Sequence, residues 1–173
     1  MNAPLKDSHP RGFSLPELLI VVAMISVISG FALLNYVQGS RAVSRTNAAV
    51  ELANHLQKAR NDSMRRRPKD VDQMAQVKIF NRRFYSVAID ADGDGYLDIP
   101  LVMSFPEEQG VEIKGPFPKT FIFDWLGQTV DLQNQRISAQ PVTVINGSGA
   151  SAITFSETGK VIVVPAVKDA AAK

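Results

Sequence analysis

RGFSLPELLIVVAMISVISGFALLNY, residues 11–36, is the longest apolar run in the chain. No residue from Leu18 to Leu34 carries a charge. A helix over residues 13–37 would be about 37 Å long, whereas the hydrocarbon core of a bilayer is about 30 Å thick. The run therefore predicts a helix that spans a membrane.

The segment before the span is short, polar and weakly basic, with Lys6 and Arg11. A cleaved secretory signal has its small-residue cleavage site after the apolar core. Here the run continues through Val37 to Gly39 without such a site, and the small residue Gly12 stands before it. Cleavage at Gly12 would leave the apolar segment in place as an N-terminal anchor.

Residues 6–25, KDSHPRGFSLPELLIVVAMI, resemble the N-terminus of type IV pilins and type II secretion pseudopilins. The resemblance implies that a prepilin peptidase cuts after Gly12, that Phe13 becomes the N-methylated terminus, and that Glu17 acts in subunit assembly. The family more often has an aliphatic residue where this chain has Pro16. A proline in the first helical turn costs little, because its missing N–H would be unpaired there.

Glu17 has two compatible interpretations. A charge that enters hydrocarbon costs a few kcal/mol and needs a partner, and cleavage would create one in the amine of Phe13. The resemblance implies that this amine belongs to the adjacent subunit of a filament. Alternatively, Ser14 and Glu17 fit the S-x-x-E capping box, in which the glutamate satisfies backbone N–H groups and the helix dipole.

Composition limits the remaining chemistry. The 173 residues include no cysteine, which excludes disulfides, a thiol nucleophile and thiolate metal sites. The formal net charge of +2 is small, so the chain as a whole lacks the strong positive charge that is typical of a nucleic-acid-binding protein. About a hundred residues remain after the leader and the helix, enough for one soluble domain with a modest core.

The anchor helix is predicted to continue to residue 67. No proline occurs from Arg41 to Arg67, and the apolar residues there fall close to helical spacing, at Val43, Val50, Ala53, Leu56 and Ala59. Arg65, Arg66, Arg67 and Lys69 cluster at the predicted end. They complement the helix dipole or form a patch for phosphates or an acidic partner. No aromatic residue is interleaved with them, so nucleic acid is not an expected partner.

Short β-like runs separated by turn residues follow from Met74 onward. They are residues 77–80, 84–89, 96–105, 111–114, 120–125, 142–145, 152–155 and 160–164. The predicted fold class is α+β and pilin-like, a long N-terminal helix packed against a mostly antiparallel sheet. The predicted organisation is leader 1–12, membrane and filament-core helix 13–37, amphipathic extension 38–67, periplasmic β domain 68–165 and flexible tail 166–173.

The C-terminal half resembles the domain of H-type pseudopilins and of FimT/FimU-like minor pilins. That family has a Phe-x-x-x-Gly element, here Phe123 and Gly127, and an Ile-Thr-Phe-Ser-x-x-Gly-x-Val hairpin, here Ile153 to Val161 with Gly159. The resemblance implies a minor pseudopilin of a type II secretion system, or alternatively a minor pilin of a type IV pilus in adhesion, motility or DNA uptake.

Residues 90–98, DADGDGYLD, open like a calcium loop. Asp90, Asp92, Asp94 and Asp98 supply hard oxygen ligands around glycines. Leu101 stands where an EF-hand has its bidentate glutamate, so any Ca²⁺ site would be incomplete. A polar turn with aspartate and glycine in their usual turn roles explains the same residues.

The sequence has no G-x-S-x-G, phosphate loop or metal-binding histidine pair, so no enzymatic activity is expected. The expected location is the bacterial inner membrane, with the β domain in the periplasm. The expected partners are the prepilin peptidase, other pilins or pseudopilins in a helical filament, and secreted cargo.

Overall fold

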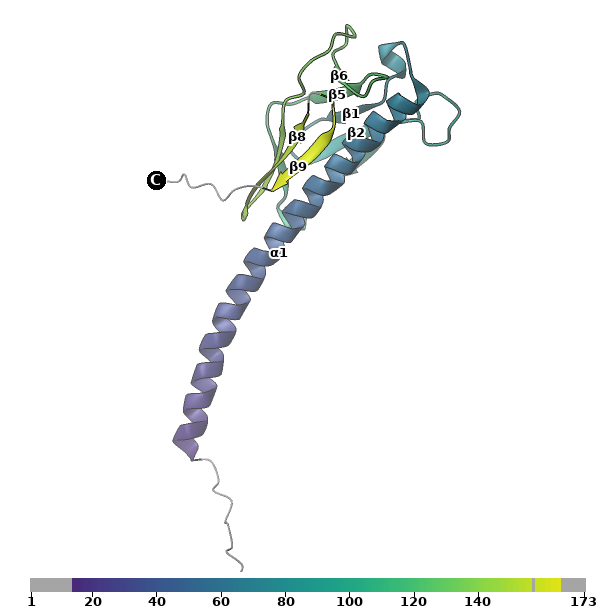
Figure 1. The fold of residues 1–173 in the computed structure, drawn as a ribbon. Coiled ribbons are helices and arrows are strands. Elements are labelled where there is room, and N and C mark those ends of the chain that lie inside the picture. Colours follow the sequence, from purple (N-terminus) through teal and green to yellow (C-terminus); the bar gives the residue numbers. More distant parts are fainter. Residues whose placement is uncertain (1–13, 157, 166–173) are drawn as a thin grey trace, which may run out of the picture. The chain divides into compact units, whose positions relative to one another are not determined.

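The structure is a computed structural model that describes residues 14–156 and 158–165. A single helix, α1 (Leu15–Arg66), takes up 52 of these residues (Figure 1). It begins one residue before Pro16 and ends where Arg67 adopts a left-handed φ of 54° immediately before Pro68. The end is capped by the Arg67 N–H, which donates to the Ser63 carbonyl at 2.9 Å. The predicted helix end is confirmed.

The chain divides into two compact units, residues 1–38 and 39–173. In the first unit, α1 presents apolar side chains on all sides, and none of its strongly apolar 18-residue window is buried. That window has a mean hydropathy of 2.5, so α1 is long and apolar enough to cross a membrane.

Besides the C-terminal half of α1, the described part of the second unit contains nine strands and two short 3₁₀ helices, η1 (Val71–Gln73) and η2 (Glu107–Gln109). The strands are β1 (Gln76–Ile79), β2 (Phe84–Ala88), β3 (Leu101–Ser104), β4 (Glu112–Lys114), β5 (Lys119–Phe123), β6 (Thr129–Val130), β7 (Val142–Asn146), β8 (Gly149–Phe155) and β9 (Val161–Pro165). They form one sheet in the order β3-β2-β1-β5-β6 and another in the order β4-β7-β8-β9. All of the strand pairings are antiparallel.

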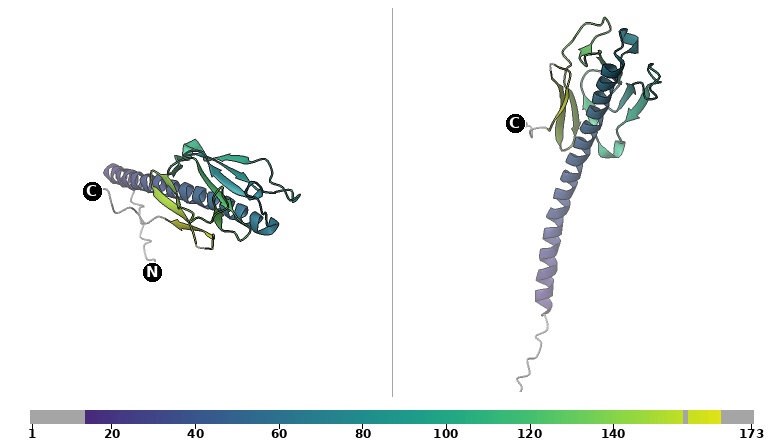
Figure 2. Two further views of the ribbon diagram at one scale, coloured as in Figure 1. Left: turned by 90° about the horizontal axis from the view of Figure 1, so that it is seen from above. Right: turned by 45° about the vertical axis from the view of Figure 1, so that its right-hand side comes forward.

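The C-terminal half of α1 supplies the centre of the core. Figure 2 shows the two sheets on opposite flanks of this half. Ala49, Leu52, Leu56 and Ala59 follow one another at helical spacing, and each is fully buried. The alanines let the sheets approach the helix closely, while the leucines fill the space between them. The sheets contribute buried residues from alternate strand positions, among them Val77, Tyr85, Phe123, Val144 and Ile153.

The predicted α+β fold of a long helix on antiparallel strands is confirmed, but two details differ. The prediction of one sheet is wrong, because β4 joins β7 rather than its neighbours in the chain. Pro116 and Pro118 stand between β4 and β5, where they interrupt backbone pairing as the chain passes between sheets. The predicted strand 96–105 is reduced to Leu101–Ser104, since the acidic turn extends to Asp98.

Candidate functional site

The candidate assembly region is the N-terminal end of α1. Glu17 lies in the first turn of the helix and is exposed. The Leu18 N–H donates to the Ser14 carbonyl at 3.2 Å, so the helical bonding begins at Ser14. Gly12 and Phe13, the predicted cleavage and methylation residues, lie outside the described residues. The structure therefore places the carboxylate at the very start of the helix, which suits both of its interpretations.

The surface that follows Glu17 is uncharged and mostly apolar. Leu18, Leu19 and Ile20 are 59%, 62% and 58% exposed, although successive residues lie on different sides of the helix. A soluble helix would confine such residues to one buried stripe. A helix that is apolar all round has to be covered by lipid or by other helices.

Basic residues at the C-terminal end of α1 form ion pairs with aspartates. Arg65 Nη2 lies 3.0 Å from Asp62 Oδ1 and 3.2 Å from Asp90 Oδ2. Arg66 Nη2 lies 2.7 Å from Asp62 Oδ2, and the side chain of Arg66 is only 7% exposed. Two of the four cations are thus paired with buried carboxylates, which halves the basic patch that the sequence predicts. We call Asp62, Arg65, Arg66 and Asp90 the ion-pair cluster. It joins the end of α1 to the acidic loop, residues 90–98.

The acidic loop is organised around Asp90. Its Oδ1 accepts the Gly93 N–H at 2.6 Å, and its Oδ2 accepts the Gly95 N–H at 3.2 Å. Burial alone would raise the pKa of this carboxyl, but these amides together with Arg65 and Arg66 hold the pKa below its usual value. Gly93 and Gly95 have φ of 85° and 95°, which a side chain would disfavour.

Three of the four predicted metal ligands come together. Asp90, Asp92 and Asp98 each offer a carboxylate oxygen, and the three atoms lie within 4.8 Å of one another. The fourth, Asp94, accepts the Tyr96 N–H at 2.8 Å, and Asp92 accepts the Asp94 N–H at 3.1 Å. Asp98 accepts the Ala91 N–H at 2.7 Å. These are the side-chain to backbone bonds of aspartate turns, and with the two arginines at Asp90 they favour the turn interpretation.

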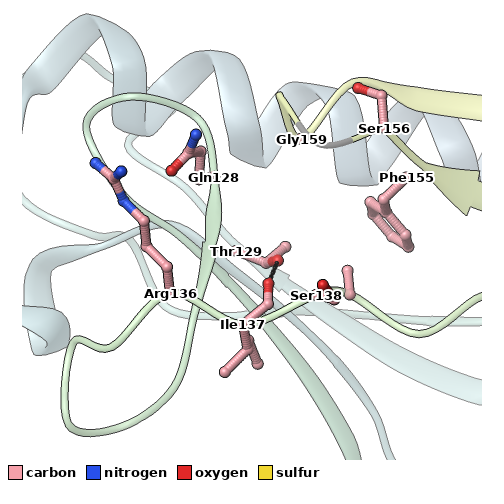
Figure 3. A pocket seen from close by; sticks show the side chains of 9 residues that line it. Gln128, Thr129, Arg136, Ile137, Ser138, Phe155, Ser156 and Gly159 are labelled. Atoms are coloured by element: carbon pink, nitrogen blue, oxygen red, sulfur yellow. Dashed lines mark hydrogen bonds between the residues drawn. The ribbon is translucent and has the colours of Figure 1, made fainter.

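A small pocket of about 350 Å³ lies between the loop 128–138 and the β8–β9 turn (Figure 3). Two of its polar side chains, those of Thr129 and Arg136, have structural partners. The Thr129 hydroxyl donates to the Ile137 carbonyl at 2.6 Å, and Arg136 lies 3.6 Å from Asp124. These bonds hold the loop rather than form an acid, base or nucleophile constellation.

The sequence did not reveal how its two C-terminal glycine motifs meet. Gly127 and Gly159 pack against one another, and a Cβ on Gly159 would overlap the Gly127 carbonyl. Arg60 fixes both turns, because its guanidinium donates to the carbonyls of Gly127 and Thr158, each at 3.0 Å. The ion-pair cluster was also missed, although Asp62, Arg65 and Arg66 stand at the i, i+3 and i+4 spacing of helical ion pairs.

Comparison with known proteins bears on the N-terminal region. Residues 7–33 match the family model described as the prokaryotic N-terminal methylation motif. The match covers the predicted cleavage residues, Glu17 and most of the apolar half of α1. No curated protein and no solved structure matches the chain. The motif, on an apolar helix that leads into an antiparallel β domain, indicates a type IV pilin-like protein.

Proposed function

We propose that this chain is a minor pseudopilin of a type II secretion system. In this proposal the prepilin peptidase removes residues 1–12, and the chain is anchored in the inner membrane with its β domain in the periplasm. It then enters a periplasmic pseudopilus through α1. One observation carries the proposal: the methylation motif coincides with the N-terminal half of α1, which is apolar on all sides and has Glu17 in its first turn.

In the proposed mechanism, the apolar part of α1 exchanges contacts with lipid for contacts with the helices of other subunits. Before assembly, lipid covers the uncharged surface of Leu18 to Leu34. In a filament, the same surface packs against the helices of neighbouring subunits, so the apolar side chains stay out of water throughout. A buried carboxylate is stable only when it is paired. Glu17 would therefore pair with the Phe13 amine of a neighbour, and the pair would set the register between subunits.

The β domain has a supporting role in this proposal. Pilin-like proteins are generally structural rather than enzymatic, and Thr129 and Arg136 in the pocket make structural bonds. The domain would be displayed by the filament, where it contacts neighbouring subunits or secreted cargo.

A minor pilin of a type IV pilus would use the same anchor, leader and β domain. A strain in which the gene for this chain is deleted distinguishes the two assignments. Loss of exoprotein secretion with intact surface pili supports the secretion system. Loss of surface pili, motility or DNA uptake with intact secretion supports the type IV pilus.

Processing is tested by mass spectrometry of the protein extracted from membranes of cells that contain the peptidase. We expect a mature chain that begins with N-methylated Phe13. An intact leader in such cells would contradict the proposal.

The role of Glu17 is tested with two variants. A glutamine at the fourth position of a capping box still caps, whereas it cannot form an ion pair. We therefore expect Glu17→Gln to be cleaved normally but to enter filaments as poorly as Glu17→Ala, measured by the sheared filament fraction. Normal incorporation of Glu17→Gln with poor incorporation of Glu17→Ala would reduce Glu17 to a capping residue.

A further inference from the structure

A hollow of about 940 Å³ lies on the outer face of the sheet that contains β4, β7 and β8. The residues that line it include Arg82, Lys114, Thr143, Ile145, Asn146 and Ala150. Thr143 and Ile145 alternate along β7 with the buried residues Val142 and Val144, so this face points away from the core. We call it the β4–β7 hollow.

The β4–β7 hollow carries excess positive charge. The side chain of Arg82 is 72% exposed and lies 3.6 Å from Glu112, which is itself 40% exposed. An open pair of this kind leaves the guanidinium largely available to another anion. Lys114 in the wall and Arg41 beside the rim are also exposed. The lining therefore holds two cations and one carboxylate, and Arg41 adds a third cation beside it.

The rim of the hollow is fixed to the beginning of the second unit. The Asn146 amide donates to the Arg41 carbonyl at 2.6 Å. Nearby, Arg45 is buried, and its guanidinium donates to the hydroxyls of Ser148 and Ser151 at 2.7 and 3.1 Å. The β7–β8 turn is thus held against α1 at Arg41 and Arg45.

Chain connectivity places this rim near the membrane. Arg41 is the fourth residue after Val37, the last aliphatic residue of the predicted span. Four residues reach at most about 14 Å even when fully extended. Whatever the orientation of the second unit, Arg41 and the bonded Asn146 therefore lie within reach of the headgroup layer when Val37 lies at the membrane surface.

We propose that the β4–β7 hollow binds the phosphate groups of anionic phospholipids in the membrane that α1 crosses. Arginine and lysine donate charge-assisted hydrogen bonds to phosphate oxygens, and the cations near a membrane surface are attracted to anionic lipid. The inference rests on the proposed membrane anchor. It assigns the hollow a role before assembly: it holds the β domain on the membrane until the subunit leaves for the filament.

The absence of cysteine from the chain permits a direct test. A single cysteine replaces Gly147, where an added Cβ would meet only Arg41 Nη1 at 3.6 Å, and a fluorophore is attached to it. The full-length protein is reconstituted in vesicles of phosphatidylcholine alone or mixed equally with phosphatidylglycerol. A trace of lipid with a nitroxide on its headgroup quenches fluorophores that approach the headgroup layer.

We expect stronger quenching at residue 147 in the anionic vesicles than in the neutral ones. The double variant Arg82→Glu/Lys114→Glu should lose this difference, and Arg82→Gln/Lys114→Gln should reduce it. Lys58→Glu/Lys160→Glu makes the same change of charge at exposed positions outside the hollow, and it should retain the full difference. Circular dichroism melts that match the parent protein establish that the variants are folded.

Two results would overturn the lipid proposal. One is equal quenching in both kinds of vesicle. The other is a difference that survives charge reversal in the hollow; if that variant also enters filaments poorly, the cations serve a neighbouring subunit. Extraction of the parent protein by alkaline carbonate would instead contradict the membrane anchor itself, so failure of the anchor is distinguished from failure of the hollow.

Discussion

At the scale of single residues, Gly159 meets the strictest requirement of the β domain. Its φ of 74° is left-handed, and the Gly127 carbonyl occupies the space that a side chain would need. Gly127 itself has a φ of 76° and lies under Arg60 and Met64. In the sequence the two glycines belong to separate motifs, whereas in the structure they pack against each other, and this contact explains why both positions are glycine.

Gly159→Ala should destabilise the β domain by about 2 kcal/mol or more, because the backbone strain adds to a clash with another backbone. A thermal melt of the purified protein measures the loss. Gly147→Ala is the matched control, since the added methyl would meet only Arg41 Nη1 at 3.6 Å. Equal melting temperatures for Gly159→Ala and the parent protein would show that the two turns can separate without cost.

The pKa of Asp90 predicts a specific acid sensitivity. A carboxyl whose folded pKa lies below its unfolded value, about 3.9, stabilises the fold above that pH. The contribution is lost as the pH falls through the unfolded value toward the lowered pKa of Asp90. The melting temperature of Asp90→Asn should therefore be lower than that of the parent at pH 7, and the gap should narrow below about pH 4.

The control for this acid sensitivity is Asp70→Asn. Asp70 is exposed and makes no capping hydrogen bond with its side chain, so its gap from the parent should stay small at every pH. A gap for Asp90→Asn that is constant down to pH 3 would contradict the ionic role of this carboxylate.

The acidic loop also allows a decision about calcium. Asp90 already receives two amides and the charge of Arg65, which a cation would have to displace or oppose. We expect millimolar Ca²⁺ to leave the melting temperature of the parent protein unchanged relative to a chelator. A rise in melting temperature that Asp92→Ala abolishes would instead restore the calcium interpretation of Asp90, Asp92, Asp94 and Asp98.

At the scale of elements, the sequence was most informative where one periodicity ran without interruption. The position of Pro68 marked the end of α1. The residues at helical spacing identified its buried face in part, because Ala53, Leu56 and Ala59 are buried whereas Val43 and Val50 are exposed. Helical bonds are local, so both features could be read from neighbouring residues.

Strand pairing was less predictable, because the partner of a strand lies far along the chain. β4 pairs with β7, although β5 and β6 lie between them in the sequence. No local sequence pattern predicts this pairing. β6 has only two residues and was missed. The acidic loop was located but misjudged in extent, since its partners Arg65 and Asp62 belong to α1 and come together with it only in the folded domain.

At the scale of the whole molecule, different forces stabilise the two units. Residues 39–173 enclose a core of their own around Leu52 and Leu56. The described part of residues 1–38 exposes its apolar side chains and depends on an external apolar environment. A destabilising substitution in one unit should therefore leave the other intact, since distant sites without shared partners act additively.

This independence predicts opposite results for two substitutions in α1. Ile25→Lys places a charge in the middle of the span, at a cost of about 2.5–3.5 kcal/mol for insertion, so it should reduce the carbonate-resistant membrane fraction. It should not change hydrogen-exchange protection in β1 or β8.

Leu56→Ala leaves a cavity in the core and should destabilise the β domain by about 2–5 kcal/mol without loss of anchoring. Val50→Ala, at a side chain that is 41% exposed, is the control for truncation on the same helix. Loss of β-domain protection in Ile25→Lys under conditions where that protein remains soluble would show that the two units fold as one.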